Sequence, residues 1–288
     1  MRSFHLLVNP GAGGGSGAGV VVAVARSLRE AGARVDVTYS PGPIASRALV
    51  GEAVAAGDVV VAVGGDGMVS SLAGGVVAAG GVLGIVPVGR GNDFARQLGL
   101  PSDAEQVAQT LLHAAPRAID VVDVDGRVVV GSVYVGVDSL ASELVNRAHR
   151  LPGSLQYPYA AVRALATYQP RTYDIAVDGI LHRHRAATVV VANSGYYGNG
   201  MHIAPAASLE DGLLDVVVVK AASRLRLIRW LPRLYDGSHV ELDEVLVLTA
   251  RQVTLSSQTA ATAYGDGEPV GPLPLTATVR PAGLNVLA

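Results

Sequence analysis

Three glycine-rich turns recur within the first hundred residues, and each follows a short apolar run and precedes a stretch with helical spacing. Near-continuous apolar strands that alternate with helices are typical of a parallel sheet covered on both faces. The sequence therefore predicts that residues 1–117 form a doubly wound, Rossmann-like α/β domain. The three turns are Asn9–Gly19, Gly64–Gly67 and Gly89–Asn92.

Hydrophobic periodicity places the elements of this domain around the three turns. Strands are expected at Phe4–Val8, Arg34–Thr38, Asp58–Val63 and Val82–Val86. Helices are expected at Val20–Ala31, Val69–Ala79 and Asn92–Leu98.

The pattern changes after Pro116, where short apolar strands dominate and Asp-Gly pairs such as Asp125–Gly126, Asp178–Gly179 and Asp211–Gly212 separate them. Asp-Gly turns favour antiparallel hairpins. Residues 118–288 are therefore expected to form a β-rich, sandwich-like second domain, with a return of the extreme C-terminus to the first domain left open. Strands are expected at Ala118–Val124, Arg127–Val137, Thr172–Val177, Ala187–Asn193, Leu214–Val219, Glu244–Leu248, Gln252–Ser256 and Leu275–Val279, and helical stretches at Leu140–His149, Tyr159–Tyr168 and Ser223–Tyr235.

Composition excludes several classes of function. The 288 residues are 50% hydrophobic with a net charge of -2, which argues against nucleic-acid binding through bulk positive charge. No cysteine is present, so disulfides, thiolate zinc sites and cysteine nucleophiles are excluded. The N-terminal segment reaches a turn too early for a signal peptide, and no apolar run is long enough to span a membrane, so we expect a cytoplasmic protein.

Glycine-rich turns at strand ends bind phosphate because backbone N–H groups can approach it closely. The first turn loosely matches both a phosphate loop and a dinucleotide fingerprint. The lysine of a phosphate loop is missing, since Lys220 is the only lysine of the chain. A dinucleotide fingerprint needs an acid at the end of the second strand, and Asp36 lies inside that strand, so the match to this motif is poor. In the second turn, Asp66 either faces a cation or ribose hydroxyl or caps the helix that follows.

Asn9-Pro10 followed by glycines, and then five further segments in order along the chain, resemble the diacylglycerol kinase catalytic-domain family. This family includes bacterial lipid kinases and sphingosine kinases and is related to NAD kinases. The segments are GGDGM (Gly64–Met68), LGIVPVGRGNDFARQLGLP (Leu83–Pro101), GVDSLASELV (Gly136–Val145), ANSGYYGNGMHIAPAASLEDGLLDVVVV (Ala192–Val219) and YGDGEP (Tyr264–Pro269).

The resemblance implies an ATP- and Mg²⁺-dependent lipid kinase that transfers the γ-phosphoryl group to the hydroxyl of a diacylglycerol-like lipid. Asp266 aligns with the general base, expected in an interdomain cleft, and Glu268 would share its face if the segment is extended. Asp211 aligns with the acid of a Mg²⁺ site, with the carbonyls of Ser208 and Leu213 beside it. The implied nucleotide contacts are Asn9, Thr38, Gly64, Gly65, Asp66, Gly67, Met68, Val69, Ser70, Gly89, Arg90, Gly91 and Asn92.

Four positions depart from the family pattern. Met68 stands where a Thr is usual, Ser71 where a Glu is usual, Arg90 replaces a small hydroxyl residue and Gly131 replaces an Asn. The guanidinium of Arg90 can bind phosphate oxygens in a bidentate manner and so compensate.

Two other functions stay open on the sequence: a kinase of a water-soluble substrate, NAD above all, and a nucleotide-binding regulator without catalysis. The expected partners are ATP, a lipid at the membrane surface and a second copy in a homodimer, with no nucleic acid. The stretch Ser223–Tyr235 places Arg226, Arg229 and Arg233 opposite an apolar side that contains Leu227, Ile228, Trp230, Leu231 and Leu234. Such a helix either packs on the β-rich domain or touches a membrane surface.

Overall fold

The computed structural model describes residues 2–10, 17–40, 42–147 and 153–288. The chain divides into two compact units. Unit 1 comprises residues 1–121 together with the C-terminal residues 280–288, and unit 2 comprises residues 122–279. The glycine cluster at residues 11–16 lies outside the described residues.

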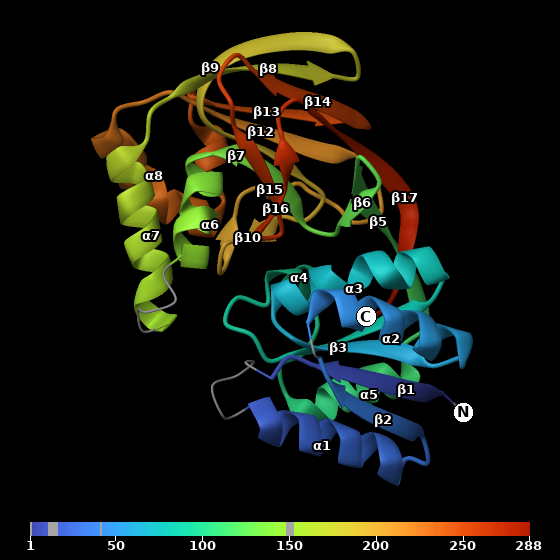
Figure 1. The fold of residues 1–288 in the computed structure, drawn as a ribbon. Coiled ribbons are helices and arrows are strands. Elements are labelled where there is room, and N and C mark those ends of the chain that lie inside the picture. The colour runs from blue at the N-terminus through green and yellow to red at the C-terminus, as the bar shows by residue number, and fades with distance from the viewer. Residues whose placement is uncertain (1, 11–16, 41, 148–152) are drawn as a thin grey trace. The chain divides into compact units, whose positions relative to one another are not determined.

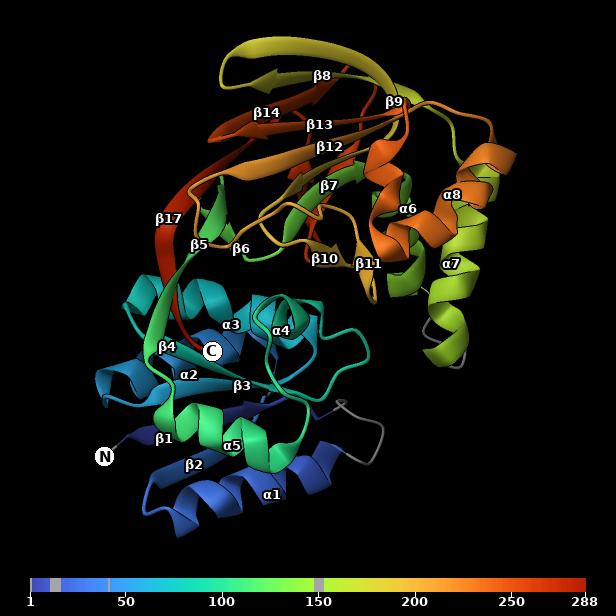
Figure 2. The same cartoon turned by 180° about the vertical axis from the view of Figure 1, so that it is seen from behind.

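Unit 1 is built around a parallel sheet with the strand order β17–β4–β3–β1–β2 (Figure 1 and, with β4 labelled, Figure 2). The strands are β1 (Ser3–Val8), β2 (Arg34–Tyr39), β3 (Val59–Gly64), β4 (Val82–Pro87) and the end of β17 (Leu275–Leu287). The helices are α1 (Gly17–Glu30), α2 (Pro43–Ala55), α3 (Asp66–Ala79), α4 (Asp93–Gln97) and α5 (Ala104–His113).

Both faces of this sheet are buried. Side chains of α1 and α5, such as Leu28 and Leu111, form a core with Phe4 and Leu6 of β1 on one face. Helices α2 and α3 pack against each other and against β3. The doubly wound α/β architecture is therefore confirmed for this unit, and it also contains α2 and α5, which the sequence analysis did not identify.

Unit 2 is β-rich and mostly antiparallel, with the strand order β16–β15–β7–β9–β8–β14–β17 and with β12 and β13 branching from β9 (Figure 1). Its elements are β5 (Pro116–Val124), which begins in unit 1, β6 (Arg127–Val129), β7 (Ser132–Gly136), α6 (Val137–Arg147), α7 (Gly153–Thr167), β8 (Arg171–Val177), β9 (Ile180–Ala192), β10 (Tyr196–Tyr197), β11 (Met201–His202), β12 (Leu214–Lys220), α8 (Arg224–Asp236), the 3₁₀ turn Ser238–Glu241, β13 (Val245–Ala250), β14 (Gln252–Ser257), β15 (Thr262–Gly265) and β16 (Glu268–Pro272).

The expected single strand Arg127–Val137 is wrong, because the chain leaves the ladder at Val130 and Gly131 and forms two strands, β6 and β7. The backbone N–H groups of these two residues donate to the Asp266 carboxylate instead of to a neighbouring strand. A side-chain acceptor far along the chain therefore decides this break, and the local pattern of apolar residues does not reveal it.

Candidate active site

The second and third glycine-rich turns of unit 1 touch backbone to backbone. Gly64 ends β3 beside Pro87 of β4, so the turns that follow these strands start side by side. A Cβ built on Gly89 would lie 2.3 Å from the Cα of Gly65 and 2.7 Å from Oδ1 of Asn92. Only glycine fits at Gly89, because a side chain there would overlap the backbone of the turn at Gly65.

Asn92 and Asp66 hold these turns in place. Asn92 adopts a left-handed conformation with φ 49°, and its Oδ1 accepts the Gly89 N–H at 2.9 Å. The Asp66 carboxylate accepts the Phe94 N–H at 3.0 Å and so caps the start of α4. The expected alternative that Asp66 caps its own helix is wrong, because the N-cap of α3 is Gly65 and makes no side-chain bond.

Asn9 and Thr38 lie near the same edge of the sheet. Asn9 follows β1, donates its backbone N–H to Val63, and has its Cβ 3.5 Å from where a Gly64 Cβ would be. The Thr38 hydroxyl, on the neighbouring strand β2, is hydrogen-bonded to His5 Nε2 at 2.9 Å.

The other residues around the turns differ in burial. Met68 and Val69 are buried, so only their backbone can face a ligand. Arg90 is exposed, Gly91 and Ser70 are half-buried, and Gly67 is exposed. The hydroxyl of Ser71, which stands where a Glu is usual, donates a hydrogen bond to the Met68 carbonyl within the same helix.

In unit 2, Asp266 lies in the tight turn between β15 and β16, with φ 50°. Its carboxylate accepts three backbone N–H groups, from Val130 at 2.9 Å, Gly131 at 3.0 Å and Ser132 at 3.1 Å. Three donors fix the position of the carboxylate and suit an ionised group. The turn is not extended, so the expectation that Glu268 shares a face with Asp266 through strand alternation is wrong, and Glu268 is exposed.

The segment that binds Asp266 is itself clamped from the other side. Buried Asn193 donates its side-chain amide to the Val130 carbonyl at 2.9 Å, and its backbone N–H to the Gly131 carbonyl. A Cβ on Gly131 would lie only 2.5 Å from Oδ1 of Asp266. The glycine that departs from the family pattern therefore makes room for this carboxylate.

A buried polar network continues from this turn. The Tyr134 hydroxyl accepts the Gly267 N–H at 3.1 Å and is hydrogen-bonded to Ser142 at 2.8 Å. Burial raises the pKa of Tyr134, and the charge of Asp266 adds to the shift, so the phenol stays protonated at neutral pH. Beside it, burial raises the pKa of Asp138, against the hydrogen bond that Thr188 donates at 2.6 Å.

The expected metal residues lie in the loop before β12. Asp211 accepts the Leu213 N–H at 3.0 Å, and the Ser208 hydroxyl accepts the Glu210 N–H at 3.3 Å. Desolvation and the charge of Asp211 raise the pKa of buried Asp215 to about 6. Among the described residues, no group of three or more histidines and carboxylates could hold a metal. One carboxylate with backbone carbonyls nevertheless suits Mg²⁺, and a cation would relieve the repulsion between Asp211 and Asp215.

Comparison with known proteins accounts for almost the whole chain. Residues 3–124 match the diacylglycerol kinase catalytic domain, and residues 131–288 match the YegS C-terminal NAD kinase beta sandwich-like domain. A diacylglycerol kinase of Mycobacterium tuberculosis is 33% identical, over 98% of this chain and 93% of the relative. The chain belongs to the diacylglycerol kinase family.

Two further relatives extend this result. A Pseudomonas savastanoi pv. phaseolicola protein named "Probable lipid kinase YegS-like" is 29% identical, over 90% of this chain and 85% of its own. A crystal structure of a diacylglycerol kinase from Bacillus anthracis has the same fold, with a TM-score of 0.77 and 19% identity over 99% of this chain and 96% of that one. The family identification is confirmed, and the enzyme class is that of a lipid kinase.

Within this kinase family fold, sequence reasoning missed three residues that shape the site. Tyr134 holds the turn at Gly267, Asn193 holds the segment under Asp266, and Asp215 is the buried partner of Asp211. Asn193 and Asp215 lie inside a segment quoted for the resemblance, so their position was available. Tyr134 carried no signal, because an alternating strand position does not reveal what its hydroxyl meets.

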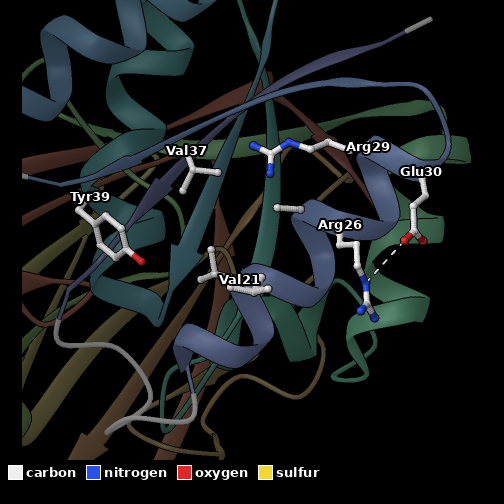
Figure 3. Close-up of a pocket in the computed structure, with 8 residues that line it drawn as sticks. Val21, Arg26, Arg29, Glu30, Val37 and Tyr39 are labelled. Atoms are coloured by element: carbon white, nitrogen blue, oxygen red, sulfur yellow. Dashed lines mark ion pairs between the residues drawn. The ribbon is translucent and has the colours of Figure 1, made fainter.

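A groove of about 410 Å³ lies elsewhere on unit 1, between α1 and the edge strand β2 (Figure 3). It is lined by Val21, Val22, Ala25, Arg26, Arg29, Glu30, Val37 and Tyr39. None of the expected site residues lines it, so we do not include it in the candidate site. In the described part of the chain, no helix is long and apolar enough to cross a membrane.

Proposed function

We propose that this chain is an ATP-dependent lipid kinase that transfers the γ-phosphoryl group to the hydroxyl of a diacylglycerol-like lipid. The observation that carries the proposal is the fixed carboxylate of Asp266, a half-buried acid held by three backbone N–H groups. An alcohol needs a proton acceptor while its oxygen attacks phosphorus. A carboxylate that cannot rotate away is suited to this role.

The chemical step we propose is a balanced transfer. The acceptor oxygen forms a bond to the γ-phosphorus while the bond from that phosphorus to the β–γ bridging oxygen breaks, and ADP leaves. The proton of the acceptor hydroxyl passes to a carboxylate oxygen of Asp266. Glu268 lies two residues after Asp266 and is exposed, so it can orient the substrate or a metal ion.

The nucleotide is proposed to bind at the glycine-rich turns of unit 1. The turn at Gly65 leads into the N-terminus of α3, whose backbone N–H groups can donate to phosphate oxygens, and exposed Arg90 supplies a charged donor. The Asp66 carboxylate would repel phosphate by itself, and it is an oxygen ligand that would hold a Mg²⁺ ion at this site. When bound, Mg²⁺ neutralises charge on the transferring phosphoryl group. A second ion is proposed at Asp211, with the carbonyls of Ser208 and Leu213.

The test is a transfer assay with γ-labelled ATP and Mg²⁺ against diacylglycerol in mixed micelles, sphingosine and NAD. The proposal expects label in the lipid phase with diacylglycerol. Label on NAD would favour the alternative of a kinase with a water-soluble substrate. ATP binding without turnover on any acceptor would favour the nucleotide-binding regulator. We propose a cytoplasmic location with work at a membrane surface, since the acceptor is insoluble in water.

A pair of aspartates tests the nucleotide site. Asp66→Ala removes the cap on α4 and the proposed nucleotide contact, whereas Asp103→Ala removes only a cap, because Asp103 accepts the N–H groups of Glu105 and Gln106 at the start of α5. Each loss should cost about 1 kcal/mol of stability. We expect ATP with Mg²⁺ to raise the melting temperature of Asp103→Ala as much as that of the wild type. The melting temperature of Asp66→Ala should not change when ATP and Mg²⁺ are added. Equal ATP stabilisation of both variants would remove Asp66 from the nucleotide site.

A further inference from the structure

Helix α8 (Arg224–Asp236) is attached to unit 2 along one side. Ser223 caps it by accepting the Arg226 N–H, and buried Leu227 packs in a cluster with Leu165, Tyr168 and Val219. Trp230 and Leu231 pack against the same cluster. The helix therefore satisfies its need for a buried face within the fold, as one of the two sequence alternatives expected.

A second apolar face of α8 is exposed. Leu225 is 82% exposed, Ile228 48% and Tyr235 56%, and exposed Pro232 lies between them. These positions are three, four and three residues apart, so they lie along one side of the helix. We name these four residues the α8 ridge. Ile228 was expected on the packed side, which is wrong, since the packed cluster is complete without it.

Arginines flank the ridge, and they fall into two groups. Arg224 and Arg226 are bonded to the fold. Arg224 donates to the Tyr168 carbonyl at 3.3 Å, and Arg226 pairs with Glu244 at 2.8 Å and lies over the Trp230 ring at 5.9 Å. Arg229 and Arg233 are exposed, one and two turns along the helix from the start of the ridge. Segment 224–236 thus holds four arginines and one acid, in a chain whose net charge is -2.

The neighbouring helix continues this character. α7 packs beside α8, and the two lie side by side in both views (Figure 1 and Figure 2). It exposes Tyr159, Val162 and Arg163, and no acidic residue occurs in its sequence. Exposed apolar side chains with arginines and tyrosine beside them are the composition of a surface that meets lipid headgroups and the first acyl carbons.

We infer that the α8 ridge docks the enzyme on an anionic lipid surface, with Leu225 and Ile228 entering the interface and Arg229 and Arg233 contacting headgroup phosphates. The inference rests on the proposed function, and it names the surface by which the kinase would reach its lipid substrate. Charge complementarity favours anionic lipid as the occupant, because exposed Arg229 and Arg233 flank the ridge in a chain whose net charge is -2. Contact should be reversible, since few side chains enter the interface.

The test is co-sedimentation with vesicles of phosphatidylcholine containing about 30% phosphatidylglycerol, at low and high salt. The ridge variant is Leu225→Ser/Ile228→Ser. Its matched control is Ile180→Ser/Leu181→Ser, which makes the same two replacements in unit 2 at residues that are 67% and 62% exposed. We expect at least about a tenfold loss of vesicle affinity for the ridge variant and wild-type affinity for the control.

A third variant, Arg229→Gln/Arg233→Gln, should weaken binding several-fold at low salt and have little effect at high salt, because screening already weakens those contacts. Wild-type affinity of the ridge variant would overturn the inference. So would a change in its sedimentation-equilibrium mass with no change in vesicle binding, because the ridge would then be a contact between two copies of the chain.

A second readout separates this inference from the proposed function. A short-chain diacylglycerol dissolved as monomers needs no interface, so the ridge variant should phosphorylate it at the wild-type rate and lose activity only on vesicles. Vesicle binding through the ridge without phosphorylation of either lipid would contradict the proposed function and leave the docking surface standing. Phosphorylation of both lipids at wild-type rates by the ridge variant would contradict the docking surface alone.

Discussion

Two Asp-Gly turns of unit 2, Asp178–Gly179 and Asp266–Gly267, are built almost alike. Both aspartates have positive φ, 46° and 50°, and both glycines continue in the left-handed region. The Asp178 N–H donates to Gln252, and its carboxylate accepts the N–H groups of Arg251 and Gln252. The Asp266 N–H donates to Ser132, and its carboxylate accepts the N–H groups of residues 130–132.

The two turns differ in what surrounds them. Asp178 is exposed, whereas Asp266 is half-buried, and only the Gly267 N–H is held by a buried tyrosine hydroxyl. A carboxylate that binds the backbone of a neighbouring strand is therefore a structural device that both turns share. The chemistry proposed for Asp266 must come from its surroundings, and Asp178 provides an internal control with the same clamp and no proposed reaction.

The largest effect is expected from Asp266→Asn. Loss of a general base lowers the rate about 10²–10⁴-fold, so kcat for lipid phosphorylation should fall by that factor. The affinity for ATP should stay within a few-fold of the wild-type affinity. The new amide would also face the Val130 N–H, which costs about 1–3 kcal/mol of stability. Steady-state kinetics with an unfolding curve for each protein would measure both.

Asp178→Asn is the control for that experiment. Its Oδ1 keeps the bonds to Arg251 and Gln252, and only the 3.2 Å contact to the second oxygen is lost. We expect a change in kcat of less than about twofold, since a clamp without a reacting group contributes nothing to the barrier. Equal losses of kcat in the two variants would mean that both aspartates are purely structural.

A smaller effect is expected from Gly131→Ala. The added methyl would lie 2.5 Å from Oδ1 of Asp266, so the carboxylate must rotate and leave N–H groups without partners. We expect kcat to fall at least about tenfold, and stability by about 1–3 kcal/mol. Gly271→Ala on β16 of the same hairpin meets nothing within 4 Å and should match the wild type. A fully active Gly131→Ala would show that the position of the clamp does not matter for transfer.

The smallest effect is expected beside another Asp-Gly pair, Asp211–Gly212, as a dependence of stability on pH. The pKa of Asp215 beside it is raised to about 6 from 3.8. Because the folded state then binds the proton more tightly than the unfolded state, stability should fall as the pH rises from about 4 to about 6. The loss of unfolding free energy should stay below roughly 3 kcal/mol, which is the value that corresponds to a pKa shift of about two units. Asp215→Asn should abolish this slope in urea unfolding, and an unchanged slope would assign it elsewhere.

The fold was largely accessible from the sequence, and the reason is local. Apolar strands that end in glycine turns identify unit 1, and Asp178–Gly179 identifies a hairpin correctly. The pair Asp211–Gly212 was also expected to mark a hairpin, which is wrong, because it lies in a loop before β12 that joins no two neighbouring strands. The same dipeptide thus gives different structures, depending on whether strands are available to pair.

The candidate site was accessible only as a set of positions. The sequence places Asp266 in an Asp-Gly turn, and the structure shows its carboxylate hydrogen-bonded to residues more than 130 positions away. Tyr134, Asn193 and Gly131 gain their roles from that long-range contact. Such contacts depend on which strands become neighbours, and no local pattern carries that information.

The central claim is that the acceptor hydroxyl reacts at Asp266, and a structure of the complex tests it most directly. The measurement is the distance from the acceptor oxygen of a short-chain diacylglycerol to the nearest Asp266 carboxylate oxygen, with a non-hydrolysable ATP analogue and Mg²⁺ bound. The account predicts a hydrogen-bond distance of about 2.6–3.2 Å. A bound lipid hydroxyl that contacts another residue, with neither Asp266 oxygen within hydrogen-bond reach directly or through one water, would contradict it.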